Sequence, residues 1–162
     1  MGLRDTDLRE TKISKIQEYA KQGYLFHGST NGNIDVLQPK LANDTDINNP
    51  FNNDCAVFAS RLPEACIFGL ISTKSVPEEI LDDVTIVVGR NRDRHLFVEI
   101  PIKLKPYIEN NIGTLYVLPP ATFDLSHIEW QVKSKEEVKP IDKISVGFED
   151  FKNLGGEVIW KE

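Results

Sequence analysis

The order of apolar and polar residues predicts a helix at the start of the chain. Over residues 7–22, apolar side chains recur at roughly helical spacing, which is typical of a helix with one buried face. The apolar positions are Leu8, Ile13, Ile16, Tyr19 and Ala20. Asp7 and Glu10 resemble a capping box, and Gly23 is a residue at which helices commonly end.

Most later apolar runs are short or alternate with polar residues, as in half-buried strands. They predict strands at 24–27, 34–37, 56–59, 84–88, 95–102, 112–118, 127–133, 141–147 and 157–160. The polar segment 89–94 predicts a hairpin turn between two of these strands. A further helix is predicted from Ser60, as its cap, to about Thr73. With helices mainly early and strands mainly late, the order favours an α+β fold.

Length and charge limit the kinds of protein that the chain can be. Its 162 residues suffice for one core, so we expect a single domain over 1–162. The net charge of −6 argues against sequence-independent binding to nucleic acid or to an anionic membrane, both of which need a positive field. No run of about 18 apolar residues is present to span a bilayer. Cys55 and Cys66 form no disulfide framework, which favours a cytoplasmic location.

Residues 40–55 differ in composition from the rest of the chain. This segment is rich in Asn and Asp and poor in apolar residues, so it is predicted to be a long loop. Long loops within compact domains often carry function.

Three short segments contain residues suited to chemistry. The first is His27-Gly28-Ser29 at the end of a predicted strand. The second is Val57-Phe58-Ala59-Ser60, with Phe68 ten positions after Phe58. The third is Glu129, followed by Trp130 and, nine positions on, by Val138. Each segment is ordinary by itself, because a lone histidine or strand carboxylate is usually structural.

The order and spacing of these segments resemble the ADP-ribosyltransferase fold, in the branch of diphtheria toxin and the poly(ADP-ribose) polymerases. That resemblance implies two small, mostly antiparallel sheets that form a central cleft, with the N-terminal helical segment 1–22 alongside. It also implies an NAD-dependent enzyme that transfers a single ADP-ribose unit. NAD would be the co-substrate, and the acidic charge favours a protein acceptor over nucleic acid.

The resemblance implies a role for each matching residue. Glu129 and His27 would be the catalytic residues, with the Glu129 carboxylate stabilising the positive charge that develops on the ribose. His27 would bind a ribose hydroxyl, Gly28 would offer backbone groups to the nicotinamide carboxamide, and Phe68 would stack on the ring. The remaining NAD-binding positions would be Ser29, Val57, Phe58 and Ser60. Segment 40–55 would be the loop over the donor.

Departures from the family pattern leave other functions open. Val57 stands where the family's His-Tyr-Glu signature has its tyrosine, which forms a wall of the nicotinamide pocket. A catalytically silent binding or interaction domain and an RNA 2′-phosphotransferase-like enzyme therefore remain alternatives. Thiol catalysis by Cys66 with His127 is disfavoured because Cys66 lies in an apolar helical stretch. His127 and Glu129 lack a third ligand at useful spacing, so we expect no metal site.

Overall fold

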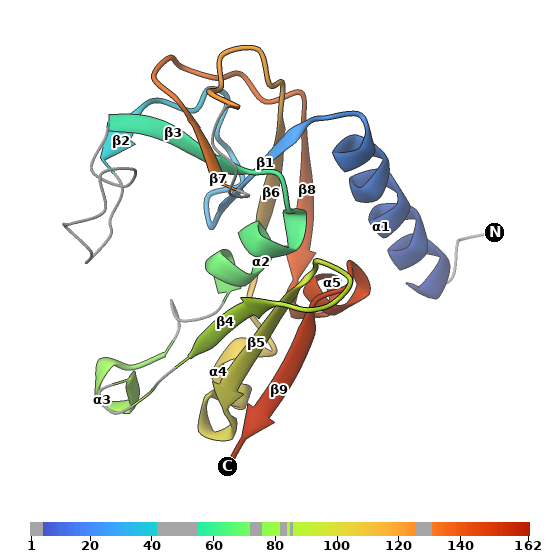
Figure 1. Ribbon diagram of the computed structural model, residues 1–162, viewed down its shortest axis with the longest axis vertical. Coiled ribbons are helices and arrows are strands. Elements are labelled where there is room, and N and C mark those ends of the chain that lie inside the picture. The colour runs from blue at the N-terminus through green and yellow to red at the C-terminus, as the bar shows by residue number, and fades with distance from the viewer. Residues whose placement is uncertain (1–4, 42–54, 72–75, 82–83, 85, 126–130) are drawn as a thin grey trace.

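The protein is a mixed α+β structure built around two sheets (Figure 1). The computed structural model describes residues 5–41, 55–71, 76–81, 84, 86–125 and 131–162. The α+β class and the two sheets agree with the sequence prediction. None of the helices in the described ranges is both long and apolar enough to cross a bilayer.

The larger sheet has six strands and carries the site described below. Its order is β2-β3-β1-β6-β8, and β7 pairs with β3. All of its pairings are antiparallel. The strands are β1 (Leu25–Ser29), β2 (Lys40–Leu41), β3 (Cys55–Ser60), β6 (Ile112–Leu118), β7 (Gln131–Ser134) and β8 (Asp142–Gly147).

The smaller sheet has three strands in the order β4-β5-β9. Strands β4 (Val87–Arg90) and β5 (Leu96–Pro101) form the predicted antiparallel hairpin, although β4 begins three residues later than expected. Strand β9 (Glu157–Lys161) lies parallel to β5 and brings the C-terminus beside the hairpin (Figure 1).

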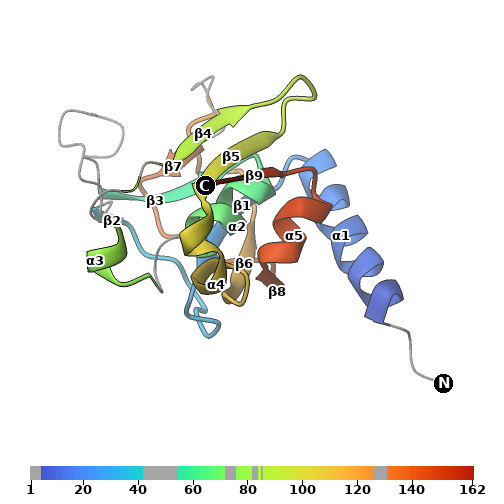
Figure 2. The same cartoon turned by 90° about the horizontal axis from the view of Figure 1, so that it is seen from below.

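Short helices link and cover the strands. Helix α2 (Pro63–Ile71) follows β3, and α5 (Phe148–Asn153) joins β8 to β9. Figures 1 and 2 show both helices beside the larger sheet, toward the smaller one. The other short elements are α3 (Glu78–Leu81), the 3-10 turn η1 (Ile102–Leu104) and α4 (Lys105–Ile108).

The predicted N-terminal helix is present as α1 (Asp5–Lys21) and lies at one side of the molecule (Figure 2). Ile13 and Ile16 are buried, which confirms that part of the predicted apolar face. The helix ends before Gly23, whose φ of +91° is readily adopted only by glycine. Asp142 on β8 binds the Lys15 ammonium and the Tyr19 hydroxyl, each at 2.8 Å. Burial raises the pKa of Asp142, but these hydrogen bonds outweigh it and the pKa is lowered.

The two faces of the larger sheet pack into two apolar clusters, because successive residues of a strand point to opposite faces. Phe26, Leu115 and Val117 face the main core with α2, α5 and the smaller sheet. Leu25 and Tyr116 face a second cluster with residues from β3 and β7. His27 lies two residues after Leu25, so it belongs to this second face.

One predicted strand is wrong and others are shifted. Residues 34–37 form no strand; only Leu37 makes an isolated bridge, with Val138. The predicted strand 127–133 is described only from Gln131 onward, where β7 begins. The predicted helix from Ser60 is observed as α2, but its expected end near Thr73 lies outside the described residues.

Candidate functional site

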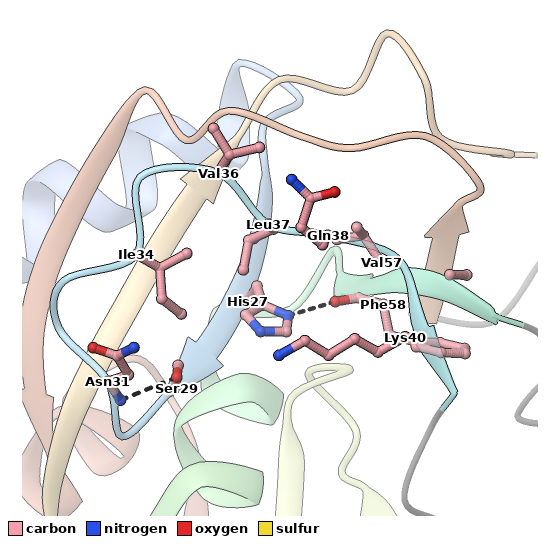
Figure 3. Close-up of a pocket in the computed structure, with 11 residues that line it drawn as sticks. His27, Ser29, Asn31, Ile34, Val36, Leu37, Gln38, Lys40, Val57 and Phe58 are labelled. Atoms are coloured by element: carbon pink, nitrogen blue, oxygen red, sulfur yellow. Dashed lines mark hydrogen bonds between the residues drawn. The ribbon is translucent and has the colours of Figure 1, made fainter.

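A cavity of about 330 Å³ lies beside β1 and β3, under the connection that leads from β1 to β2 (Figure 3). We call it the β1–β3 cavity. Its described polar lining comes from His27, Ser29, Asn31, Gln38 and Lys40. Its described apolar lining comes from Ile34, Val36, Leu37, Ala56, Val57 and Phe58. One cavity thus combines hydrogen-bonding groups with an apolar surface, as small-molecule sites commonly do.

The cavity lies where β1 and β3 separate. The two strands are in register at one pair, Phe26 with Ser60, whereas β1 pairs with β6 along all five of its residues. Beyond Phe26, the His27 side chain joins β1 to β3. Its Nδ1 atom lies 2.7 Å from the carbonyl oxygen of Phe58.

This hydrogen bond fixes the ring and the tautomer of His27. A carbonyl oxygen only accepts hydrogen bonds, so Nδ1 must carry the proton and donate it. In the neutral ring, Nε2 is then an acceptor. Figure 3 shows the ring lying within the cavity, above the end of the Lys40 side chain. The backbone of β3 therefore holds the imidazole in one orientation within the cavity.

The connection that roofs the cavity is held by a buried tyrosine from β6. The Tyr116 hydroxyl donates to the Asn31 carbonyl at 2.5 Å and accepts from the Ile34 amide at 3.1 Å. The Lys143 ammonium donates to the Gly32 carbonyl at 2.5 Å. Because Tyr116 is only 1% exposed, the wall formed by Asn31 and Ile34 is attached to the core of the sheet.

The structure brings four of the sequence-predicted site residues into this cavity. His27 and Ser29 come from β1, and Val57 and Phe58 come from β3, about thirty residues further along the chain. Val57 is buried and lines the cavity with an apolar side chain. At the corresponding position, the family that the sequence resembles has a tyrosine as an aromatic wall.

Gly28 and Ser60 do not line the cavity among its described residues. Both lie close enough to Cys66 on α2 that hydrogen bonding from the Ser60 side chain and from the Gly28 and Ser60 backbones acts to lower the pKa of its thiol, although burial outweighs this. The Cys66 thiol itself donates to the Phe26 carbonyl at 3.1 Å. The Ser60 hydroxyl accepts from the Leu62 amide at 3.0 Å, just before α2 begins.

Phe68 lies apart from the cavity in this structure. Its ring packs against Phe151 of α5, with the ring centroids 5.8 Å apart, and is partly buried against the main core. The predicted catalytic Glu129 and most of the predicted donor loop, residues 42–54, lie outside the described residues. The resemblance implies that Phe68 stacks on the nicotinamide ring. In this structure the Phe68 ring packs against Phe151 instead.

Cys66 is expected to be unreactive in the folded protein. Burial is the largest influence on its thiol and raises the pKa to about 12, so almost no thiolate exists at neutral pH. Cys55 is exposed at the start of β3. We expect iodoacetamide at pH 8 to modify Cys55 and to spare Cys66 until the protein is unfolded in guanidinium, as measured by mass spectrometry. Equal labelling of both cysteines in the native protein would contradict the assignment and would reopen thiol chemistry at this position.

Seven of the described lining residues were not identified from the sequence as site residues, and the three polar ones among them are Asn31, Gln38 and Lys40. Lys40 was included only as the first residue of the predicted loop 40–55. It lies instead on β2, where it pairs with Ala56. The sequence around Asn31 reads Asn-Gly-Asn, which indicates a turn but not that the turn roofs a cavity.

Within the described residues, no group of three or more His, Cys, Asp or Glu side chains is arranged to hold a metal ion.

Comparison with known proteins found no matching protein-family model, no matching curated protein and no matching solved structure. The functional argument therefore depends on the cavity and on the residues that line it.

Proposed function

We propose that this protein is an NAD-dependent ADP-ribosyltransferase of the ADP-ribosyltransferase-like fold, and that part of the NAD molecule binds in the β1–β3 cavity. One observation carries the proposal. The His-Gly-Ser segment and the Val-Phe segment, whose spacing suggested the family, contribute His27, Ser29, Val57 and Phe58 to a single cavity. The two mostly antiparallel sheets and the flanking N-terminal helix are compatible with that fold.

The dimensions and lining of the cavity suit one half of a dinucleotide. Its volume of about 330 Å³ is near the lower end of the usual range for ligand sites, roughly 300–1,000 Å³. The oriented His27 imidazole and the Ser29 hydroxyl are groups that can bind ribose hydroxyls. The apolar side chains of Ile34, Leu37 and Val57 in the lining suit the flat face of a base.

The chemistry proposed for the site needs few catalytic groups. Breaking the glycosidic bond of NAD releases nicotinamide as a neutral molecule, so no general acid has to protonate it. Positive charge develops on the ribose carbon, and a nearby carboxylate lowers the energy of that transition state. Glu129 is proposed as this carboxylate. His27 is proposed to hold the ribose, and the acceptor nucleophile then attacks the carbon that nicotinamide leaves.

A second candidate, a binding domain without catalytic activity, has specific support. Phe68 packs against the main core, Val57 stands where the family has its signature tyrosine, and the Cys66 thiol lies close to the Gly28 backbone. These three features differ from the aromatic stack and the open backbone groups that the resemblance implies for nicotinamide, and they favour a domain without catalysis. A protein with this arrangement would bind ADP-ribose or another nucleotide and release no nicotinamide.

Thermal unfolding and nicotinamide release separate the two candidates. For the transferase, NAD at about 100 times its Kd adds about 2.7 kcal/mol to the free energy of unfolding. That corresponds to a rise in Tm of roughly 5–10 °C for a chain of this size. Nicotinamide should also appear slowly, by hydrolysis, even without an acceptor. His27→Ala should abolish most of the Tm shift, whereas His27→Asn, whose amide nitrogen is attached at the same carbon position as Nδ1 and can donate to the Phe58 carbonyl, controls for loss of that hydrogen bond.

Each outcome of this experiment selects one function. Stabilisation by ADP-ribose and NAD without nicotinamide release selects the binding domain. Loss of a 2′-phosphate from RNA that requires NAD as the acceptor, with nicotinamide released only when that RNA is present, selects the phosphotransferase alternative. A full Tm shift in His27→Ala would show that NAD binds elsewhere and would overturn the proposed site.

A further inference from the structure

The described lining of the β1–β3 cavity carries a positive charge, although the chain as a whole is acidic. The whole chain has a formal charge of −6, yet the described side chains that line the cavity include no carboxylate. The described lining has one permanently charged group, the ammonium of Lys40. Several other described lysines are paired with acidic side chains: Lys12, Lys15, Lys105, Lys152 and Lys161. Among the described residues, Lys40 has no such ion pair.

The backbone around Lys40 directs its side chain to the cavity. Strand β2 is only two residues long, and its pairing with Ala56 and Cys55 fixes the position of Lys40 beside β3. Figure 3 shows the side chain extending along the cavity, with its nitrogen below the His27 ring. The ammonium and the imidazole are therefore presented to the same space.

We infer that Lys40 is the phosphate-binding residue of this cavity and makes the site selective for ligands in which a phosphate is joined to a nucleoside. Among the described residues the Lys40 ammonium makes no ion pair, and an ammonium binds a phosphate as a point charge. The apolar side chains of the lining and the hydroxyl-binding groups of His27 and Ser29 account for the nucleoside. The nucleoside part of this inference rests on the proposed function, whereas the phosphate part rests on Lys40 alone.

Calorimetry with small ligands tests the inference on the full chain. The ligands are adenosine, AMP, ADP-ribose and inorganic phosphate at constant ionic strength. A hydrogen bond to a charged group contributes enough for about a 10-fold change in affinity at an exposed site. We therefore expect AMP to bind the wild type at least about 10-fold more tightly than adenosine, and inorganic phosphate to bind more weakly than AMP.

Three variants assign this preference to Lys40. Lys40→Gln should remove the preference for AMP and leave adenosine affinity unchanged. Lys40→Arg should retain the preference, because the charge is kept. Lys21→Gln is the matched control, since it makes the same change in net charge on the exposed last turn of α1. It should behave as the wild type.

The inference is overturned if Lys40→Gln keeps the AMP preference, if adenosine binds as tightly as AMP, or if neither AMP nor ADP-ribose binds at millimolar concentration. Inorganic phosphate binding as tightly as AMP would contradict the nucleoside part. Failure here is distinguishable from failure of the proposed function. If nicotinamide is released but AMP is not preferred over adenosine, the transferase proposal is supported and the Lys40 inference is not. If AMP is preferred through Lys40 but no nicotinamide is released, the Lys40 inference is supported and the transferase proposal is not.

Discussion

Replacing Glu129 with Gln is expected to lower nicotinamide release from NAD by a factor of about 10² to 10³. Glutamine has nearly the same size and shape as glutamate and lacks its negative charge. The substitution therefore removes the electrostatic stabilisation of the positively charged transition state and preserves the space that the side chain fills. Because this stabilisation acts mainly in the transition state, kcat should fall far more than NAD affinity.

The assay measures nicotinamide released with time, and the Tm shift with NAD measures binding in the same samples. Glu136→Gln is a suitable control because it makes the same chemical change at an exposed position just after β7. It should retain wild-type release. If Glu129→Gln and Glu136→Gln release nicotinamide equally fast, Glu129 is not the catalytic carboxylate, even when NAD binding is unchanged.

Parts of the fold with strong local signals were predictable from the sequence. Strand β6 was predicted at 112–118 and is observed as Ile112–Leu118. Helix α1 was predicted over 7–22 and is observed as Asp5–Lys21, because its apolar spacing and the Gly23 stop are both local features. The β4–β5 hairpin followed in the same way from the polar residues between two apolar runs.

Features that depend on distant contacts were not predictable. The apolar pattern of residues 34–37 is typical of a strand. In the structure, however, the Ile34 amide donates to the Tyr116 hydroxyl, and only Leu37 forms a β-bridge, with Val138. Helix α5 has six residues, which is too few for a periodic pattern to be recognised. The parallel pairing of β9 with β5 joins residues about sixty positions apart, and no local signal specifies it.

The candidate site was predictable in part for the same reason. Spacing along the chain suggested that His27 and Phe58 belong to one site, and the 2.7 Å hydrogen bond between them supports the association. Lys40 was missed because a two-residue strand leaves no recognisable pattern. The predicted role of Phe68 depended on the direction in which a helix faces, and that direction is set by α5, whose position is determined by the tertiary fold.

Phe151→Ala is expected to destabilise the protein by about 3–5 kcal/mol, a large share of the roughly 5–15 kcal/mol that a domain usually has. Phe151 is fully buried and joins α5 to Phe68 on α2. The loss combines the transfer free energy of the ring with the cost of the cavity left behind. Denaturant unfolding measures it. Val88→Ala, on the exposed edge of the smaller sheet, is the control and should change stability by less than about 0.5 kcal/mol.

Gly156 gives this prediction a second, independent test. A Cβ atom at Gly156 would lie 2.5 Å from the Phe151 ring, so Gly156→Ala forces the ring to move. We expect a loss of about 1–3 kcal/mol from this overpacking. In the double variant Phe151→Ala/Gly156→Ala the ring is absent, and with it the three atoms that lie nearest to the added methyl group. The two losses should therefore be less than additive by at least about 1 kcal/mol. Simple additivity would show that the ring of Phe151 does not lie against Gly156, and that α5 is joined to β9 in another way.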